Sequence, residues 1–355
     1  MEQIIVRNNI LDAIEDYAEK KHINKILLVC GHSLEKYGLG QKLINNQKIA
    51  CVFQEFTPNP KYEEVLKGVK AYKSAGCDSI LAVGGGSAMD VAKAIKAFVS
   101  MPEGVNFLEE EIKDNGIVFM AAPTTSGTGS EATRFSVIYK DGVKQSVEHV
   151  SLLPELVLME AKFLDKLPVY QKKTTMLDAL CHAIESFWSI NSNDTSKEYS
   201  VKAIKMIKEN YRGYLDNLPE SNKSMLEAAF IAGQAINITK TTAAHAMCYK
   251  ITTVFNLPHG HAAALCLKAV WEYTGKLAKE ACDEKLIKTL NELEEIISLN
   301  DYRKLLDELQ IQFEYSLSKE QLDMLSQSVN ADRLGNHPVK LDTATLRKMY
   351  SDISK

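Results

Sequence analysis

The chain has 355 residues, which at roughly 150 residues per domain predicts about two domains. A hydrophobic share of 45% and a charged share of 25% are typical of globular proteins and exclude disordered and collagen-like chains. The formal net charge of -4 provides no overall positive field for a nucleic-acid backbone or an anionic membrane, so we expect a small-molecule substrate and neither of those partners.

The beginning of the chain lacks the basic region and long apolar run of a secretory signal, and charges interrupt every later apolar stretch. We therefore expect a cytoplasmic protein. Its seven cysteines form no CxxC pair and lie mostly in apolar runs, so we expect them to be reduced and buried.

The first half of the chain alternates short apolar runs with amphipathic stretches. Four β-branched runs predict buried parallel strands at residues 25–30, 49–53, 79–83 and 117–121. Helical periodicity lies between them, for example at residues 62–75 and 88–98. This alternation predicts a doubly wound, Rossmann-like α/β domain over residues 1–163, with a nucleotide site at the carboxyl ends of its strands.

One hairpin is expected near the end of this domain, because Asp141-Gly142 separates two alternating runs at residues 134–139 and 144–150. From residue 164 to 355 the pattern changes to helical periodicity, with examples at residues 176–188, 225–238 and 286–299. We expect an all-helical second domain that packs closely on the first, with a ligand site in the cleft between them.

Two loops have the composition of phosphate-binding turns. Each follows a predicted strand, so backbone amides and the start of the next helix would face one point, as a pyrophosphate requires, although a single tight turn would explain either loop alone. The first contributes Gly84, Gly85, Gly86 and Ser87, followed by Asp90 and Lys93 on the helix; the second contributes Thr124, Thr125 and Thr128.

A second constellation combines one carboxylate with several imidazoles. Asp178 and His182 are four residues apart within a predicted helix, so both side chains project from one face, as two ligands of a metal would. Alone, this pair would more often be a hydrogen bond on a helix surface. His245, His259 and His261 add imidazoles in an otherwise apolar region, which favours a divalent-metal site.

These residues resemble the iron-dependent (group III) alcohol dehydrogenases, in the dehydroquinate synthase-like superfamily. The resemblance covers nearly the whole chain, through residues 58–60, 84–93, 123–133, 178–185 and 258–260. His245 follows Asp178 by 67 positions and His259 follows His245 by 14, as in that family. The resemblance implies that Asp178, His182, His245 and His259 bind Fe²⁺ or Zn²⁺, and that His261 is either a hydrogen-bonding neighbour or a substrate contact. It also implies that Asn59 contacts the cofactor, and it makes a homodimer possible.

Such a metal has an open position for a carbonyl oxygen, which it would polarise as a Lewis acid while hydride moves to or from a nicotinamide. Many family members carry a histidine four residues after the third ligand, where this chain has Tyr249, expected either to donate a proton or to pack in the core.

The stretch before the third ligand also departs from the family, because Lys240, Thr241 and Thr242 replace small apolar residues. With Lys250 and Arg134 they predict an anion pocket, although each cation would also be explained as an exposed surface charge. This region looks like the phosphonoacetaldehyde reductase branch, which implies reduction of phosphonoacetaldehyde to 2-hydroxyethylphosphonate.

The end of the first predicted strand bears on the nucleotide. Family members that use NAD usually have an aspartate there, whereas this chain has Gly31, His32 and Ser33, which favours NADPH and still permits NADH. We therefore expect a metal-dependent reductase of a small anionic aldehyde. The alternatives are a general alcohol or diol dehydrogenase, a dehydroquinate-synthase-like lyase, and a metal or nucleotide binder without activity.

Overall fold

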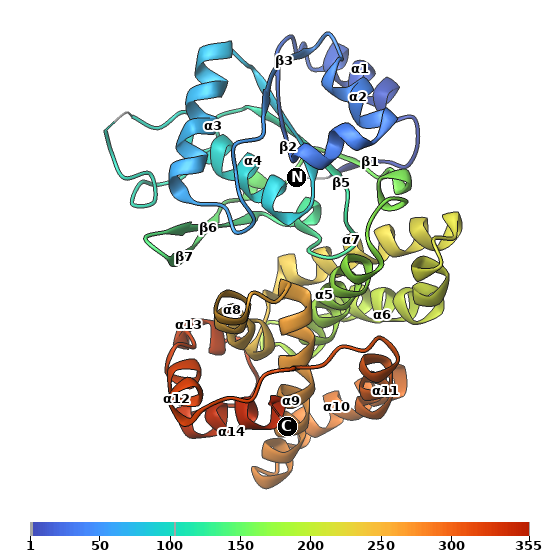
Figure 1. Ribbon diagram of the computed structural model, residues 1–355, viewed down its shortest axis with the longest axis vertical. Coiled ribbons are helices and arrows are strands. Elements are labelled where there is room, and N and C mark those ends of the chain that lie inside the picture. Colours follow the sequence, from blue (N-terminus) through green and yellow to red (C-terminus); the bar gives the residue numbers. More distant parts are fainter. Residues whose placement is uncertain (1–2, 103, 355) are drawn as a thin grey trace. The chain divides into compact units, whose positions relative to one another are not determined.

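The computed structural model describes residues 3–102 and 104–354. The chain divides into two compact units, the first ending at Lys166 and the second beginning at Leu167. The boundary expected after residue 163 falls inside a short 3-10 helix, Ala161–Leu164. Figure 1 shows the first unit as a mixed α/β structure and the second as helices only, so the expected fold class is confirmed.

The first unit is built on a six-stranded sheet in which every neighbouring pair is parallel. In spatial order, its strands are β1 (Ile4–Val6), β8 (Leu156–Leu158), β5 (Val118–Pro123), β4 (Ser79–Gly84), β2 (Ile26–Cys30) and β3 (Ile49–Phe53). Four were predicted to within about two residues. The sequence did not reveal β1 and β8, because a three-residue strand is too short to show a periodic pattern.

Helices cover both faces of this sheet, as Figure 1 shows for α1 (Ile10–Lys20) and α2 (Gly38–Ile44) opposite α3 (Tyr62–Ala75) and α4 (Gly86–Phe98). Successive strand residues point to opposite faces, so Leu27 packs in the core under α3 and α4 while Leu28 packs under α1 and α2. Burial on both faces explains why these strands are continuous apolar runs.

The expected hairpin is confirmed as β6 (Phe135–Lys140) and β7 (Val143–Glu148), which pair antiparallel. Asp141 and Gly142 form its two-residue turn, and both have positive φ angles, of 52° and 73°. That conformation is typical of a type I′ turn and explains the Asp-Gly pair.

The second unit contains ten α-helices among its described residues, Leu167–Ser354. They are α5 (Val169–Trp188), α6 (Asp194–Leu215), α7 (Pro219–Thr239), α8 (Ala243–Phe255), α9 (His259–Glu280), α10 (Glu284–Ile296), α11 (Leu299–Glu308), α12 (Lys319–Gln327), α13 (Ala331–Leu334) and α14 (Thr343–Ile353). The helix expected over residues 286–299 is interrupted, because Ser298 caps a new helix with its hydroxyl.

Helix α5 is the central element of this unit and packs against α6, α7 and α9. Every residue from Met176 to Trp188 is buried. Polar side chains in that segment must therefore find partners inside the protein, which draws attention to its carboxylates and imidazole.

Within the described residues, no helix combines the length and apolar character needed to cross a membrane. No disulfide joins any two of the seven cysteines, all of which the structure describes.

Candidate metal centre and phosphate-binding loops

The two candidate phosphate loops lie side by side in the first unit. Strand β4 ends at Gly84, which is in register with Pro123 at the end of β5. The amide of Thr124 donates a hydrogen bond to the Gly84 carbonyl over 3.0 Å, which ties the second loop to the first. The structure therefore brings together two loops that are about 40 residues apart in sequence.

Contact between these loops explains why the turn needs glycine. A Cβ atom on Gly86 would lie 2.8 Å from Cγ2 of Thr128, and one on Gly85 would lie 3.1 Å from Oγ1 of Thr125. The first amides of a helix have no partner within the helix, and anion binding at a helix N-terminus uses these groups. All the predicted contacts in these turns are partly exposed, namely Gly84, Gly85, Gly86, Ser87, Thr124, Thr125 and Thr128.

Lys93 does not fit the cofactor role predicted for it. Its side chain is fully buried, and its Nζ lies 2.6–3.0 Å from five oxygens of the segment after β5. Asp90 belongs to the same cluster, accepting a hydrogen bond from Ser130 Oγ over 3.4 Å. Burial lowers the pKa of Lys93 and raises that of Asp90. Lys93 therefore anchors α4 to that segment, because its ammonium protons are all engaged with protein oxygens.

The remaining nucleotide candidates lie at the carboxyl ends of β2 and β3. Gly31 follows β2 directly and is partly exposed, while His32 and Ser33 begin an exposed 3-10 turn, His32–Lys36. Asn59 is also exposed and has a positive φ of 58°. Because β2 lies between β3 and β4, all four residues are at the same edge of the sheet as the two loops.

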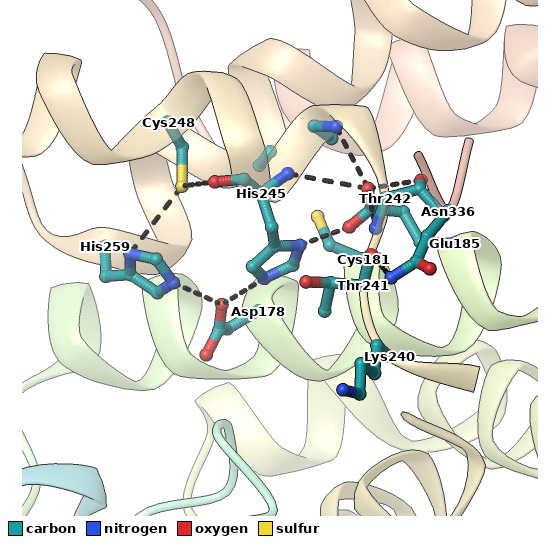
Figure 2. Close-up of polar contacts among 12 residues, drawn as sticks. Asp178, Cys181, Glu185, Lys240, Thr241, Thr242, His245, Cys248, His259 and Asn336 are labelled. Carbon is teal, nitrogen blue, oxygen red and sulfur yellow. Dashed lines mark hydrogen bonds and ion pairs between the residues drawn. The ribbon is translucent and has the colours of Figure 1, made fainter. Parts of the chain in front are cut away.

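In the second unit, three of the four predicted ligands converge. Asp178 comes from the middle of α5, His245 from the first turn of α8, and His259 is the first residue of α9. One potential ligand atom from each lies within 4.8 Å of the others. Oδ1 of Asp178 is 3.4 Å from Nε2 of His245 and 3.8 Å from Nε2 of His259. Figure 2 draws both contacts as dashed lines.

His182, the fourth predicted ligand, lies beside this group rather than in it. Its ring stacks on that of His245, with centroids 4.6 Å apart and planes 19° apart. It is buried, as are Asp178 and His245, whereas His259 is partly exposed.

Charge interactions favour an ionised carboxylate in this cluster. Burial alone would raise the pKa of Asp178, but the imidazoles of His182, His259 and His245 hold it well below its ordinary range. Burial would lower the pKa of His245, yet the Glu185 and Asp178 carboxylates raise it to about 9. One carboxylate oxygen and two imidazole nitrogens facing a common point are suitable donors for Fe²⁺ or Zn²⁺, so the residues fit such an ion.

The sequence prediction missed Glu185, which lies two helical turns after Asp178. Its Oε2 contacts Nδ1 of His245, and its side chain is fully buried. A signal was available, because positions 178, 182 and 185 share one face of a helical segment, residues 176–188, that is otherwise largely apolar.

Thr242, which the sequence predicts to contact the substrate, has its hydroxyl hydrogen-bonded to Glu185 and Trp188. It is fully buried, its hydroxyl donates to Oε1 of Glu185 over 2.6 Å, and it accepts a hydrogen bond from Trp188 Nε1 over 3.2 Å. The hydroxyl is thus engaged within the protein. Thr241 is partly exposed, and its carbonyl accepts from Asn336 Nδ2, a contact drawn in Figure 2.

The two predicted lysines are both exposed. Lys250 lies on α8. Lys240 ends α7 with φ 60° and ψ 175°. That backbone region is normally accessible only to glycine, and another residue there costs about 1–3 kcal/mol.

Tyr249 lies on α8 next to the candidate metal centre. Its ring stacks on His259, and the guanidinium carbon of Arg333 lies 4.7 Å from its centroid. Among the described side chains, no carboxylate pairs with Arg333. The sequence prediction missed this arginine, because it lies about 80 positions after Tyr249 in a short helix, α13, without a recognisable motif.

Two further predicted substrate residues have other partners. The ring nitrogens of His261 contact the Tyr170 hydroxyl at 2.8 Å and the Gln312 carbonyl at 3.0 Å, as expected of a hydrogen-bonding neighbour. Arg134 forms an ion pair with Glu148 of the hairpin at 3.0 Å. Its charge is therefore neutralised within the first unit.

Both units of the chain match models of one protein family. Residues 2–161 match the model of the iron-containing alcohol dehydrogenases, and residues 172–353 match that of the C-terminal part of the same family. A curated relative, the NADPH-dependent butanol dehydrogenase of Clostridium saccharobutylicum, is 28% identical over 95% of this chain and 93% of its own length. Aldehyde-alcohol dehydrogenase 2 of Entamoeba histolytica is 31% identical over 74% of this chain, which spans only 33% of that longer protein.

Solved structures share the fold. An iron-containing alcohol dehydrogenase from Thermotoga maritima is 26% identical and superposes with a TM-score of 0.86, covering 100% of this chain and 98% of its own. A sulfoacetaldehyde reductase from Bifidobacterium kashiwanohense, in complex with NAD⁺, is 24% identical with a TM-score of 0.89, covering 100% and 97% of the two chains.

Proposed function

The chain belongs to the iron-containing alcohol dehydrogenase family, and from this premise we propose that it is a metal-dependent oxidoreductase that uses NADPH or NADH to reduce a small anionic aldehyde. The specific reaction we propose is that of the phosphonoacetaldehyde reductase branch, from phosphonoacetaldehyde to 2-hydroxyethylphosphonate. The observation that carries the oxidoreductase assignment is the convergence of Asp178, His245 and His259.

Asp178, His245 and His259 would hold the metal, Fe²⁺ or Zn²⁺, and His182, which stacks on His245, is the proposed fourth ligand. When bound, the metal would supply Lewis acidity to a carbonyl group and the nicotinamide would supply the hydride. Asp178 would contribute one negative charge, which offsets half the charge of a divalent cation, and the imidazoles would contribute neutral donors. Tyr249, whose ring stacks on that of His259, would donate a hydrogen bond or a proton to the oxygen that becomes the product hydroxyl.

The glycine and threonine turns after β4 and β5 would bind the nucleotide pyrophosphate, since they are partly exposed and lie side by side at the beginning of α4. Gly31, His32, Ser33 and Asn59 lie at the same sheet edge and would contact the adenosine part. No acidic side chain stands at Gly31 to repel a 2′-phosphate, which supports NADPH and leaves NADH possible. The named relatives include users of both nucleotides.

Two observations support an anionic substrate. Lys240 occupies a backbone conformation that glycine would adopt without strain, and such strain persists mainly at functional sites. The Arg333 guanidinium lies over the ring of Tyr249, which in turn stacks on His259. We therefore propose Lys240, Thr241, Lys250 and Arg333 as the substrate-anion residues, and leave out Arg134, Thr242 and His261. The sulfoacetaldehyde reductase that shares this fold is named for an anionic aldehyde.

A general alcohol dehydrogenase is the second candidate, because the relative that aligns over 95% of this chain is named for butanol, a neutral alcohol. Initial rates of NADPH and NADH oxidation would distinguish the two candidate functions. They would be measured with phosphonoacetaldehyde and with butanal, on purified protein loaded separately with Fe²⁺ and Zn²⁺. A preference for the phosphonate of about 100-fold in kcat/KM, equivalent to about 2.7 kcal/mol, is expected for an anion pocket. Equal or faster turnover of butanal would reject the phosphonate assignment and favour the second candidate.

A further inference from the structure

We propose that Glu185 is a positioning residue that fixes the tautomer and orientation of His245 for metal binding. The inference rests on the metal dependence proposed above and concerns a residue outside the ligand set. Glu185 contacts His245 through Nδ1, the ring nitrogen on the side away from Asp178. Figure 2 shows His245 between the carboxylates of Asp178 and Glu185, both of which belong to α5.

The surroundings of Glu185 favour an ionised carboxylate. Its side chain is completely buried, and a buried carboxylate is tolerated only where hydrogen bonds or charges compensate the loss of water. Of the four donors that converge on Oε1, the three nearest are the Thr242 amide at 3.0 Å, the Thr242 hydroxyl at 2.6 Å and the Ala244 amide at 2.9 Å, and the His245 amide is farther away at 3.4 Å. Hydrogen bonds of this kind favour the charged form of a carboxylate.

These donors also explain why the carboxylate stays in place. Three of them are amides at the beginning of α8, where free N–H groups and the helix dipole favour a negative charge. Thr242, the residue before α8, makes no cap with its own side chain. Glu185 of α5 therefore caps α8 from another helix, which holds the first turn of α8, and with it His245, against α5.

The ionised carboxylate also fixes the position of the proton on His245. An ionised carboxylate is an acceptor only, so Nδ1 of His245 must carry the hydrogen that points at Oε2 of Glu185. With a hydrogen held on Nδ1, the nitrogen that can present a lone pair to a metal ion is Nε2, the atom that lies 3.4 Å from Oδ1 of Asp178. A ligand nitrogen needs that lone pair, and carboxylates that orient metal-bound histidines in this way affect affinity strongly.

The test uses Glu185→Gln, which keeps the shape of the side chain and replaces one acceptor oxygen with an NH₂ donor. The donors around Oε1 will hold the amide oxygen, so the amide NH₂ will face Nδ1 of His245 and donate to it. His245 must then carry its hydrogen on Nε2, where it blocks coordination. We expect affinity for Zn²⁺ and Co²⁺, measured by competition with a chromophoric chelator, to fall roughly 10- to 100-fold.

Two readouts separate positioning from simple structural damage. The visible spectrum of the Co²⁺-loaded protein reports the ligand field directly, and we expect it to change in Glu185→Gln. The metal-free variant should keep the helical circular dichroism of the metal-free wild type, since the donors around Oε1 remain satisfied. Wild-type affinity together with a wild-type Co²⁺ spectrum in the variant would overturn the proposal.

A second pair of variants keeps the proposal testable if Glu185→Gln does not fold. Thr242→Val removes one donor from Oε1 and leaves the amides, so metal affinity should fall by less than in Glu185→Gln, while Thr242→Ser, which retains the hydroxyl, should restore it. Equal affinity in Thr242→Val, Thr242→Ser and wild type would also overturn the proposal. Failure of the wild type to bind either metal would instead reject the proposed function, and the inference with it.

Discussion

The ring of Tyr249 lies nearly parallel to that of His259, with centroids 5.4 Å apart and planes 20° apart. Arg333 adds a cation to this pair, 4.7 Å from the tyrosine centroid. The three side chains come from α8, α9 and α13. This arrangement places a phenol and a positive charge beside a candidate metal ligand and leads to the first prediction.

Replacing Arg333 by Gln should lower kcat/KM for an anionic aldehyde by about tenfold or more, because a charge-assisted hydrogen bond contributes roughly 1.5–3 kcal/mol. Turnover of butanal should change little. Steady-state kinetics with both aldehydes measures the ratio. Arg303→Gln is the matched control, since Arg303 is exposed and paired with Glu272. An equal loss for the two aldehydes would show that Arg333 acts only through Tyr249 packing.

Replacing Lys240 by Gly should stabilise the second unit by about 1 kcal/mol or more, because the backbone at this position is strained for any other residue. The same change should reduce kcat/KM for the anionic aldehyde. Lys240→Ala separates the effects, since it removes the amine and retains the strain. Thermal unfolding of the three proteins tests the first expectation, and kinetics with the two aldehydes tests the second. Unchanged selectivity in both variants would remove Lys240 from the substrate pocket.

Replacing Gly86 by Ala should weaken nucleotide binding. The added Cβ would lie 2.8 Å from Thr128, so the threonine loop must move, and overpacking of this kind costs roughly 1–3 kcal/mol. Titration of NADPH and NADH, followed by nucleotide fluorescence, measures the dissociation constants. Gly275→Ala in α9 is the control, because a Cβ there meets no atom within 4 Å. Wild-type dissociation constants in Gly86→Ala would argue against nucleotide binding at this turn.

Replacing Lys93 by Met should destabilise the first unit by about 3 kcal/mol, because it leaves several buried oxygens without their donor. Amide hydrogen exchange in α4 should accelerate accordingly. Under conditions where the variant is folded, its affinity for nicotinamide nucleotides should stay close to wild type. A selective loss of nucleotide affinity with unchanged exchange rates would restore the cofactor role that the sequence suggested.

Stability of the second unit should fall at mildly acidic pH because of His337. Its Nε2 contacts Thr274 Oγ1 at 3.0 Å, and burial lowers its pKa from 6.5 to about 4, despite an opposing effect of Glu185. Between those two values the unfolded chain takes up a proton that the folded chain does not. Unfolding free energy should therefore decrease as pH falls from 6.5 to 4, by about 3 kcal/mol in all, and His337 should contribute no slope above that range.

Urea unfolding followed by tryptophan fluorescence can measure this loss, because the two tryptophans of the chain, Trp188 and Trp271, both lie in the second unit. His337→Gln keeps a donor for Thr274 and removes the titrating group. The slope of the unfolding free energy against pH should be steeper in the wild type than in the variant, by an amount that corresponds to about one proton taken up on unfolding. Identical slopes would show that His337 titrates normally in the folded protein.

Local spacing in the sequence was sufficient for much of the fold. Helix α3 and strand β3 begin and end at the predicted residues, and the Asp141-Gly142 turn is as expected. Asp178 and His182 share a helix face as their four-residue spacing requires. These predictions succeeded because each depends on neighbours within one or two turns of the chain.

The sequence by itself thus predicted four of the six strands of the sheet, the hairpin turn, two turns with the composition of phosphate-binding loops and four candidate metal ligands. Only the tertiary structure decided which polar groups meet. Lys93 is engaged with oxygens about 40 positions away, and Glu185 orients a histidine 60 positions away. A buried charge requires a partner, but it does not specify where in the chain that partner lies, so packing alone determines whether a lysine or carboxylate anchors the fold or supports the site.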